Sequence, residues 1–317
     1  MIDQFNREID YLRISLTDKC NLRCIYCMPK DVENNYKINQ MDVEEYKTII
    51  RVFSKAGIKK IRFTGGEPLV YKHLEELIEY TKTICNIENI CMTTNGIGLL
   101  EKVEDLTKKG LNSINISLDS LNEYKYKQIT GGGNLNKVLK SLEKCIDLGL
   151  KVKINCVLIK GINDDELNDF INLAKKKDID IRFIELMPLG EGIKFFQDGY
   201  INLNETLAKF RNLDPIKVNE KSVAQYYKIE NSKGRIGIIT PMSCSFCESC
   251  NRIRLTSNGS IKLCLHSNEE ISIKEYLKDE NKFLEVINKI IYNKPEKHNL
   301  IKNEKSDTER NMYQIGG

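Results

Sequence analysis

Cys20-Asn21-Leu22-Arg23-Cys24-Ile25-Tyr26-Cys27 lies shortly after a strand-like run, Tyr11-Leu12-Arg13-Ile14-Ser15-Leu16. Its three cysteines can hold three corners of an iron–sulfur cube, which takes four ligands in all. An iron that lacks a protein ligand can bind a substrate and pass it an electron. Two other interpretations stay open at this stage: a zinc site completed by ligands from elsewhere in the chain, and three unrelated thiols.

The composition is that of a globular protein. The chain has 317 residues, 41% apolar and 30% charged, which favours one large domain with an extension, or two domains. No apolar run is long enough for a membrane span, and no signal segment is recognisable. The net charge is only +4, and positive and negative residues are interspersed along the chain, so we do not expect a nucleic-acid partner.

Cysteine usage indicates a reducing compartment, and we expect a cytoplasmic protein. Seven of the eleven cysteines fall in two tight groups, which is unlike the spread framework of a disulfide-rich protein. The remaining four are expected to be buried: Cys85, Cys91, Cys145 and Cys156.

Strand-like and helical patterns alternate along the first 190 residues. Strands are predicted at 10–16, 59–64, 89–94, 112–118, 150–158 and 179–186, and helices near 42–56, 72–85, 99–109, 136–148 and 164–177. Six strand–helix units predict a parallel α/β sheet with right-handed crossovers. Because a closed barrel of this type needs eight units, we predict a partial (β/α)6 TIM-like barrel that is open along one side.

The pattern changes after Gly190, and we divide the chain into a barrel, 1–190, and a C-terminal extension, 191–317. The extension is predicted to be α+β and to close the open side of the barrel. It should contain a short helix at 201–211, strands at 213–219, 225–231 and 234–240, and a hairpin of 253–255 and 260–263 around Asn258-Gly259. A helix at 272–292 and a polar tail at 294–317 complete it.

Polar residues follow the predicted strands where each one ends. They are Thr64-Gly65-Gly66-Glu67-Pro68, Thr93-Thr94-Asn95-Gly96, Ser117-Leu118-Asp119-Ser120 and Met187-Pro188. In parallel α/β barrels the active site lies at this C-terminal face. The glycine pair is expected to let a small molecule approach the backbone.

Four predicted strands carry a cation between two apolar residues: Arg13, Arg62, Lys153 and Arg182. Strand alternation turns these side chains into the barrel, where an uncompensated charge costs several kcal/mol. Two explanations are open. Either carboxylates such as Glu67, Asp119 and Glu185 neutralise the cations, or the lumen binds a polyanion such as a triphosphate.

The extension carries a second group of cysteines, Cys247, Cys250 and Cys264, which the hairpin brings together. Three ligands again suggest an open iron, although Cys244 could supply a fourth ligand and close the site. Arg252 and Arg254, two residues apart, lie on the same face of a predicted strand. Either both side chains point toward one site, or they form the solvated face of an edge strand. The final Gly316-Gly317 favours a frayed end, with insertion into a pocket as the alternative.

These motifs resemble the radical S-adenosylmethionine superfamily and, over nearly the whole chain, the GTP 3′,8-cyclase (molybdenum cofactor biosynthesis protein A) family. The resemblance rests on the first cysteine motif, Gly65-Gly66-Glu67-Pro68, the second cysteine set with Asn251-Arg252-Ile253-Arg254-Leu255, and the diglycine tail. Cys244 departs from the family pattern.

The resemblance implies a lyase with two [4Fe-4S] clusters that uses S-adenosyl-L-methionine. A 5′-deoxyadenosyl radical removes the ribose 3′ hydrogen of GTP, and C3′ then attacks C8 of guanine. The product is (8S)-3′,8-cyclo-7,8-dihydroguanosine 5′-triphosphate, a precursor of molybdopterin. The family also implies a homodimer, an electron-donor protein that the sequence does not identify, and transfer of the product to the next enzyme of the pathway.

The resemblance also assigns individual residues. Cluster ligands are Cys20, Cys24, Cys27 and Cys247, Cys250, Cys264; S-adenosylmethionine contacts are Tyr26, Gly66, Ser117 and Met187; GTP contacts are Arg13, Arg62, Thr93, Lys153, Arg252 and Arg254; and catalytic residues are Arg252, Arg254, Gly316 and Gly317. The second cluster is expected to hold the guanine. Two rival interpretations are a peptide-modifying radical enzyme with an auxiliary cluster, and a non-enzymatic zinc- or iron–sulfur-binding module.

Overall fold

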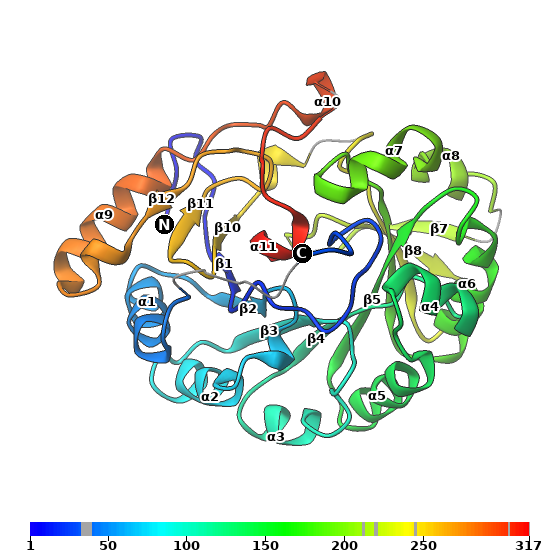
Figure 1. The fold of residues 1–317 in the computed structure, drawn as a ribbon, viewed down its shortest axis with the longest axis horizontal. Helices are drawn as coiled ribbons and strands as arrows, with labels where there is room; N and C mark the ends of the chain where they lie inside the picture. The colour runs from blue at the N-terminus through cyan, green and yellow to red at the C-terminus, as the bar shows by residue number, and fades with distance from the viewer. Residues whose placement is uncertain (33–39, 211–212, 219–220, 244–245, 304, 317) are drawn as a thin grey trace.

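A single mixed sheet runs through the computed structural model, which describes residues 1–32, 40–210, 213–218, 221–243, 246–303 and 305–316 (Figure 1). Its centre consists of six parallel strands in sequence order. They are β1 (Tyr11–Ser15), β2 (Lys60–Thr64), β3 (Asn89–Thr94), β4 (Ser113–Ser117), β5 (Lys151–Leu158) and β6 (Asp180–Glu185). All six predicted strands are confirmed, because runs of buried Ile, Leu, Val and Phe alternate with inward-facing residues on each of them.

Helices connect these strands and cover the outside of the sheet (Figure 1). They are α1 (Val43–Lys55), α2 (Leu74–Thr83), α3 (Val103–Lys108), α4 (Glu123–Thr130), α5 (Leu135–Asp147) and α6 (Leu167–Lys176). α1 begins at a capping box, in which Asp42 accepts from the backbone N–H of Glu45 and Glu45 accepts from that of Asp42. Its buried face, which includes Ile49 and Phe53, packs on the sheet, and each such side chain contributes about 1.5–3 kcal/mol.

α4 was not predicted, and it supports the first cysteine loop. The backbone N–H groups of Arg23 and Ile25 donate to the carbonyls of Thr130 and Ile129 at its C-terminal end, both at 2.9 Å. Gly131 then ends the helix in the left-handed region, at φ +68°, where a side chain would collide with the backbone of Arg23.

The extension adds strands to both edges of the central sheet. β10 (Arg252–Leu255) pairs in parallel with β1 and continues into β11 (Ser260–Lys262) and β12 (Ile271–Ser272). At the other edge, β9 (Arg235–Ile239) pairs in parallel with β6 and is followed by β8 (Gln225–Ile229) and β7 (Leu213–Ile216). The sheet does not close on itself, so the predicted partial barrel with an α+β extension on its open side is confirmed.

Several boundaries in the extension differ from the prediction. The helix expected at 272–292 is α9 (Glu280–Tyr292), because 271–272 pairs with β11 and Asp279 caps the helix by accepting from Lys282 N–H. The helix expected at 201–211 is α8 (Leu203–Leu207), and α7 (Ile193–Gly199) precedes it. The polar tail contains α10 (Leu300–Asn303) and α11 (Met312–Ile315). Residues 211 and 219 of the predicted ranges lie outside the described residues.

One hydrophobic core spans both parts of the chain, and Phe283 of α9 meets Phe53 of α1 edge to face at 6.2 Å. The division at residue 190 stays a prediction. Of the four isolated cysteines, Cys91, Cys145 and Cys156 are buried as expected, whereas Cys85 is partly exposed at the end of α2.

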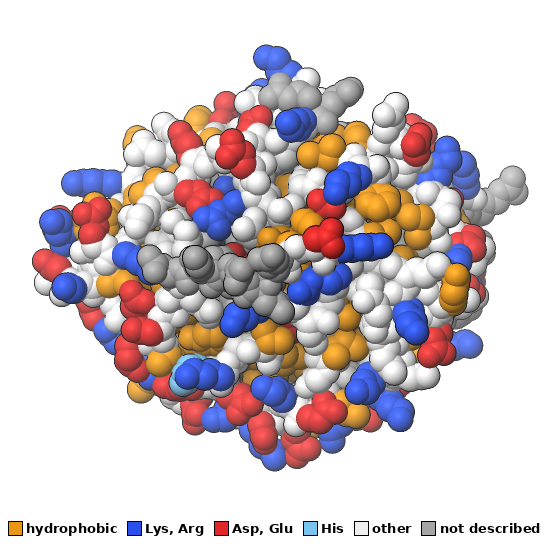
Figure 2. All heavy atoms as spheres, viewed as in Figure 1, with side chains coloured by type: hydrophobic (Ala, Val, Ile, Leu, Met, Phe, Trp, Pro, Cys, Tyr) orange, Lys and Arg blue, Asp and Glu red, His pale blue; other side chains and the backbone are white. Residues whose placement is uncertain are grey.

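The surface carries both signs of charge: on the face drawn in Figure 2, Lys and Arg side chains are interspersed with Asp and Glu. Among the described helices, none has the length and apolar composition needed to cross a membrane.

Candidate active site

The barrel lumen contains a cavity of about 840 Å³. Sixteen predicted site residues line it: Cys20, Cys24, Cys27, Cys247, Cys250, Cys264, Tyr26, Gly66, Ser117, Met187, Arg13, Arg62, Thr93, Lys153, Arg252 and Arg254. Gly316 contacts two of these arginines, and Gly317 lies outside the described residues. The structure therefore brings both cysteine groups and all the predicted cations into one space.

The glycine pair after β2 is hydrogen-bonded through its backbone to the segment that leads into the first cysteine loop. The backbone N–H of Gly66 donates to Thr17 O at 2.6 Å, and that of Glu67 donates to Lys19 O at 2.8 Å. A Cβ on Gly66 would lie 2.4 Å from Lys19 O. The chain itself thus needs glycine at residue 66, in addition to any ligand that approaches the exposed backbone.

The three thiols of the first loop lie partly buried in the same cavity, and this decides what they can bind. Burial and the neighbouring thiols raise the pKa of Cys27 to about 12, and burial with the neighbouring Cys27 holds the pKa of Cys24 well above its usual value. Thiolates in such a place need the positive charge of bound metal. Within the described residues, no three His, Cys, Asp or Glu side chains surround a position for a single ion. The donor set therefore fits a cluster, in which each thiolate binds a different iron, better than it fits zinc.

Glu67 does not neutralise the lumen cations. Its carboxylate accepts hydrogen bonds from Thr94 Oγ1 and Asn95 N, both at 2.7 Å, and from Leu69 N at 3.1 Å. Burial raises its pKa to about 7 despite these bonds. Glu67 thus connects the glycine loop with the end of β3.

The carboxylates of Asp119 and Glu185 also accept hydrogen bonds from groups other than the strand cations. Asp119 accepts from Tyr26 Oη at 2.6 Å and from Val157 N at 2.8 Å, while burial raises its pKa to about 6. Glu185 accepts from Ser243 Oγ at 2.6 Å and from Met242 N at 3.0 Å. The proposal that these three carboxylates compensate the strand cations is wrong, because hydroxyl and backbone N–H donors bind their oxygens and none of the three forms an ion pair with a strand cation among the described residues.

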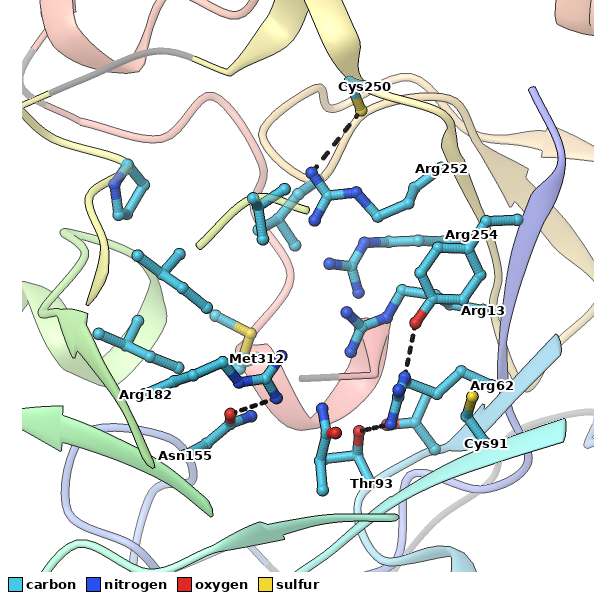
Figure 3. Close-up of a pocket in the computed structure, with 18 of the residues that line it drawn as sticks. Arg13, Arg62, Cys91, Thr93, Asn155, Arg182, Cys250, Arg252, Arg254 and Met312 are labelled. Carbon is cyan, nitrogen blue, oxygen red and sulfur yellow. Dashed lines mark hydrogen bonds between the residues drawn. The ribbon is translucent and has the colours of Figure 1, made fainter. Parts of the chain in front are cut away.

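Five arginines point into the cavity from four strands: Arg13 of β1, Arg62 of β2, Arg182 of β6, and Arg252 and Arg254 of β10 (Figure 3). Arg13 and Arg254 are partners in the register of β1 and β10. Arg254 is 9% exposed and the Arg252 guanidinium lies 5.1 Å from the centre of the Phe246 ring. The alternative that Arg252 and Arg254 form a solvated edge is therefore wrong.

The charge on these arginines is incompletely compensated. Arg62, Arg182, Arg252 and Arg254 form no ion pair with a carboxylate of the described residues, and neutral partners such as Tyr11 Oη, Met92 O and Asn155 Oδ1 accept from them instead. Burial and the neighbouring Arg252 lower the pKa of Arg254 to about 10, and burial and Arg254 hold that of Arg13 well below its usual range. A bound polyanion would relieve this repulsion.

Lys153 has an internal counter-charge. Its Nζ lies 3.3 Å from Asp180 Oδ2, and Arg235 binds the same carboxylate through Nε and Nη2 at 2.8 Å each. Internal pairing thus holds for Lys153, with a carboxylate that the sequence did not single out.

We expect Asp180→Asn to lower the free energy of unfolding by about 3 kcal/mol at neutral pH, because it leaves buried Lys153 without its carboxylate. Although burial alone would raise it, Arg235 and Lys153 hold the pKa of Asp180 below its usual 3.8. The stabilisation should therefore be complete above pH 3.8 and disappear as the pH falls through the folded-state pKa. Urea unfolding of the metal-free proteins between pH 7 and pH 3 measures this.

Asp165→Asn serves as the control, because the Lys125–Asp165 pair lies at the surface, is screened by solvent and should contribute little to stability. Equal losses in the two variants would contradict the role given to Asp180.

The second cysteine group lines the same cavity as the first loop. Cys247 begins a 3-10 turn, Cys247–Ser249, while Cys250 precedes β10 and Cys264 follows β11. Arg252 Nη2 lies 4.0 Å from Cys250 Sγ (Figure 3). Although burial alone would raise it, Arg252 and Lys294 lower the pKa of the Cys250 thiol. Cys244 lies outside the described residues, so its part in this site stays a prediction.

The C-terminal tail enters the cavity, and the favoured interpretation of a frayed end is wrong for residues 312–316. Arg254 Nη1 donates to the carbonyls of Ile315, at 3.0 Å, and Gly316. Gly316 has φ +72°, and a Cβ there would meet Thr64 Cγ2. Figure 1 shows α11 over the centre of the barrel.

Tyr11 and Lys294 also line the cavity, and the sequence reasoning missed both. The Tyr11 hydroxyl accepts from Arg62 Nε at 2.5 Å, and although burial alone would raise it, Arg62 and Arg13 lower the pKa of Tyr11 to about 8. Strand alternation could have found Tyr11, because it lies two residues before Arg13. Nothing in the local pattern distinguishes Lys294 from the surface lysines of its segment.

Comparison with known proteins agrees with this geometry. The family model described as Radical SAM superfamily matches residues 14–174, and the one described as Molybdenum Cofactor Synthesis C matches residues 179–300. Proteins named GTP 3′,8-cyclase from Clostridium botulinum (strain Hall), Clostridium acetobutylicum and Alkaliphilus oremlandii are 50%, 49% and 46% identical, and each alignment covers 100% of both chains.

Two solved structures share the fold at lower identity. Streptococcus suis SuiB bound to S-adenosylmethionine has a TM-score of 0.59 and 15% identity over 92% of this chain and 66% of that one. Native anSMEcpe with bound AdoMet has a TM-score of 0.58 and 16% identity over 96% of this chain and 93% of that one.

Proposed function

The chain belongs to the GTP 3′,8-cyclase family of the radical SAM superfamily, and on that premise we propose that it converts GTP to (8S)-3′,8-cyclo-7,8-dihydroguanosine 5′-triphosphate in molybdenum cofactor biosynthesis. The observation that carries this proposal is the shared cavity, which two cysteine triads and five arginines line together. Neither rival function accounts for that combination.

Two [4Fe-4S] clusters and S-adenosylmethionine are its cofactors. When bound, they supply the electron and the 5′-deoxyadenosyl radical that removes the ribose 3′ hydrogen. We assign the first cluster to Cys20, Cys24 and Cys27, and the second to Cys247, Cys250 and Cys264. Tyr26 of the first cysteine loop and the strand-end residues Gly66, Ser117 and Met187 are placed around S-adenosylmethionine.

The chain's own contribution is to bind, orient and exclude water. Arg13, Arg62, Arg252 and Arg254, with Lys153 and Thr93, form the proposed GTP site, and planar guanidinium groups are suited to paired hydrogen bonds with phosphate. The tail closes the cavity over the two arginines that its carbonyls already contact, Arg13 and Arg254. This closure keeps water away from a radical reaction.

A product assay with isotopic labelling tests the proposal. The reconstituted protein, kept free of oxygen, is given S-adenosylmethionine, a reductant and GTP that carries deuterium at the ribose 3′ carbon. We expect the cyclised triphosphate and one deuterium in the 5′-deoxyadenosine, and none when the label is at the 2′ carbon instead. Deuterium-free 5′-deoxyadenosine from 3′-labelled GTP, with no cyclised product, would contradict the proposed reaction.

The remaining assignments are also proposals. We place the protein in the cytoplasm as a homodimer that receives electrons from a donor protein and passes its product to the next enzyme of the pathway. We propose a barrel domain at 1–190 and a cluster-bearing extension at 191–317. The full-length similarity to the cyclases supports these assignments.

A further inference from the structure

Arg7, which precedes β1, uses its whole guanidinium group to join three distant segments. Nε donates to Asp3 Oδ2 at 2.6 Å, and Nη1 donates to Cys247 O at 2.9 Å and to Glu296 O at 2.8 Å. Nη2 donates to Pro295 O at 2.7 Å. The side chain of Arg7 is almost fully buried, so these bonds form away from solvent.

These contacts fix the position of Cys247. Cys247 begins a 3-10 turn of only three residues, and the facing segment 294–296 follows the end of α9 without regular structure. Arg7 supplies a hydrogen-bonded connection between the two. Asp3, which is 2% exposed, holds Arg7 in place by accepting from its Nε and from its backbone N–H.

Lys294, in the same segment, lines the cavity together with Cys250 and Cys264 and contacts the residue before Cys264. It is 2% exposed, and its Nζ donates to the carbonyl of Leu263, the residue before Cys264. Burial lowers the pKa of Lys294, while Cys250 and Cys264 act in the opposite direction. Lys294 forms no ion pair with a carboxylate of the described residues, so the thiolates of Cys250 and Cys264 would supply the compensating negative charge.

We propose that Arg7 and Lys294 are positioning residues for the second iron–sulfur cluster. Arg7 fixes Cys247 relative to segment 294–296, and Lys294 places a positive charge beside the thiolates of Cys250 and Cys264. The inference rests on the proposed function only in that the second cysteine group holds a cluster. Groups that surround cluster ligands affect both the stability and the reduction potential of the cluster. We expect Arg7 to control whether the second cluster is retained, and Lys294 to control its reduction potential.

Iron and sulfide analysis of Arg7→Gln tests the first role. Gln cannot supply the several donors of the guanidinium fork, so carbonyls of Cys247 and 295–296 lose their partner. We expect about four irons in place of about eight, with loss of the second cluster's electron paramagnetic resonance signal. The first cluster's response to S-adenosylmethionine should persist, and Arg7→Lys should regain part of the lost iron.

Arg51→Gln is the matched control for Arg7→Gln. Arg51 also joins separate elements, through Glu280 and the Tyr80 hydroxyl, but does not line the cavity that contains the proposed cluster cysteines. We expect it to keep about eight irons. If Arg7→Gln also keeps them, or if both variants lose both clusters together, the role of Arg7 is wrong.

The potential of the second cluster tests the role of Lys294. Removing a nearby positive charge disfavours the reduced cluster, so Lys294→Met should shift the midpoint potential of the second cluster to more negative values, and Lys294→Arg should restore it. The first cluster's potential should not move. An unchanged second potential in Lys294→Met would overturn this role. A wild-type protein with a single cluster would instead refute the proposed function itself.

Discussion

Arg254→Ala is expected to reduce formation of the cyclised product by about 10³-fold, a loss typical of removing a charged group that binds the reacting molecule. Arg254 is buried between the second cysteine group and the tail, and its guanidinium contacts the carbonyls of Ile315 and Gly316. The substitution would remove both a proposed phosphate contact and the hydrogen bonds that hold the tail in the cavity.

The first cluster should be unaffected by Arg254→Ala. Its loop is supported by α4 and by the glycine pair, which do not depend on β10. We therefore expect unchanged iron content and continued slow reductive cleavage of S-adenosylmethionine, measured as 5′-deoxyadenosine. Arg51→Ala is the control, because it removes an arginine outside the cavity. Cyclisation by Arg254→Ala at the rate of Arg51→Ala would refute the assigned role.

Gly66→Ala is expected to abolish both binding of the first cluster and cleavage of S-adenosylmethionine. The new Cβ would lie 2.4 Å from Lys19 O and 2.7 Å from Asp18 O, so the backbone that leads into Cys20 has to move. Because backbone is not free to rotate away as a long side chain is, the three thiols would lose their common geometry. Iron content should fall from about eight to about four per chain.

The control for this prediction is Gly149→Ala, which separates steric overlap from conformational strain. Gly149 has φ +72°, but a Cβ there would meet nothing within 4 Å. It should cost about 1 kcal/mol of stability through the left-handed backbone and leave both clusters in place. Full iron content and normal S-adenosylmethionine cleavage in Gly66→Ala would contradict our account of the cysteine loop.

Most of the barrel was predictable from the sequence, because buried apolar residues recur at regular positions along each central strand. A cation such as Arg62 is recognisable because it lies between two apolar residues of a strand. Since successive side chains of a strand point to opposite faces, this position predicts that the cation points into the lumen. α4 was not recognisable, because its buried residues are mainly Tyr126, Ile129 and Thr130 at its C-terminal end.

The order of the tail depends on contacts that no local pattern reveals. Arg310 binds Glu270 through Nε and Nη2, and the backbone N–H of Ser306 donates to Pro188 O at 3.3 Å. A polar segment with such partners is ordered, although its composition is typical of a loose end.

The partners of buried charges were the least predictable feature. Asp180 meets Lys153 and Arg235 because of the registers of β5, β6 and β9, which are set by the folded sheet. Arg7 binds a carbonyl 240 residues further along the chain. Sequence alone identified which residues need a partner, but the three-dimensional arrangement selects the partner.

The central claim is that two open clusters face one nucleotide pocket, and electron paramagnetic resonance of the reduced, oxygen-free protein tests it most directly. We predict about eight irons per chain and two cluster signals, one altered by S-adenosylmethionine alone and the other by GTP alone. Arg254→Ala should keep the first response and weaken the second. A single cluster, or a second signal that GTP leaves unchanged in the wild-type protein, would contradict the account.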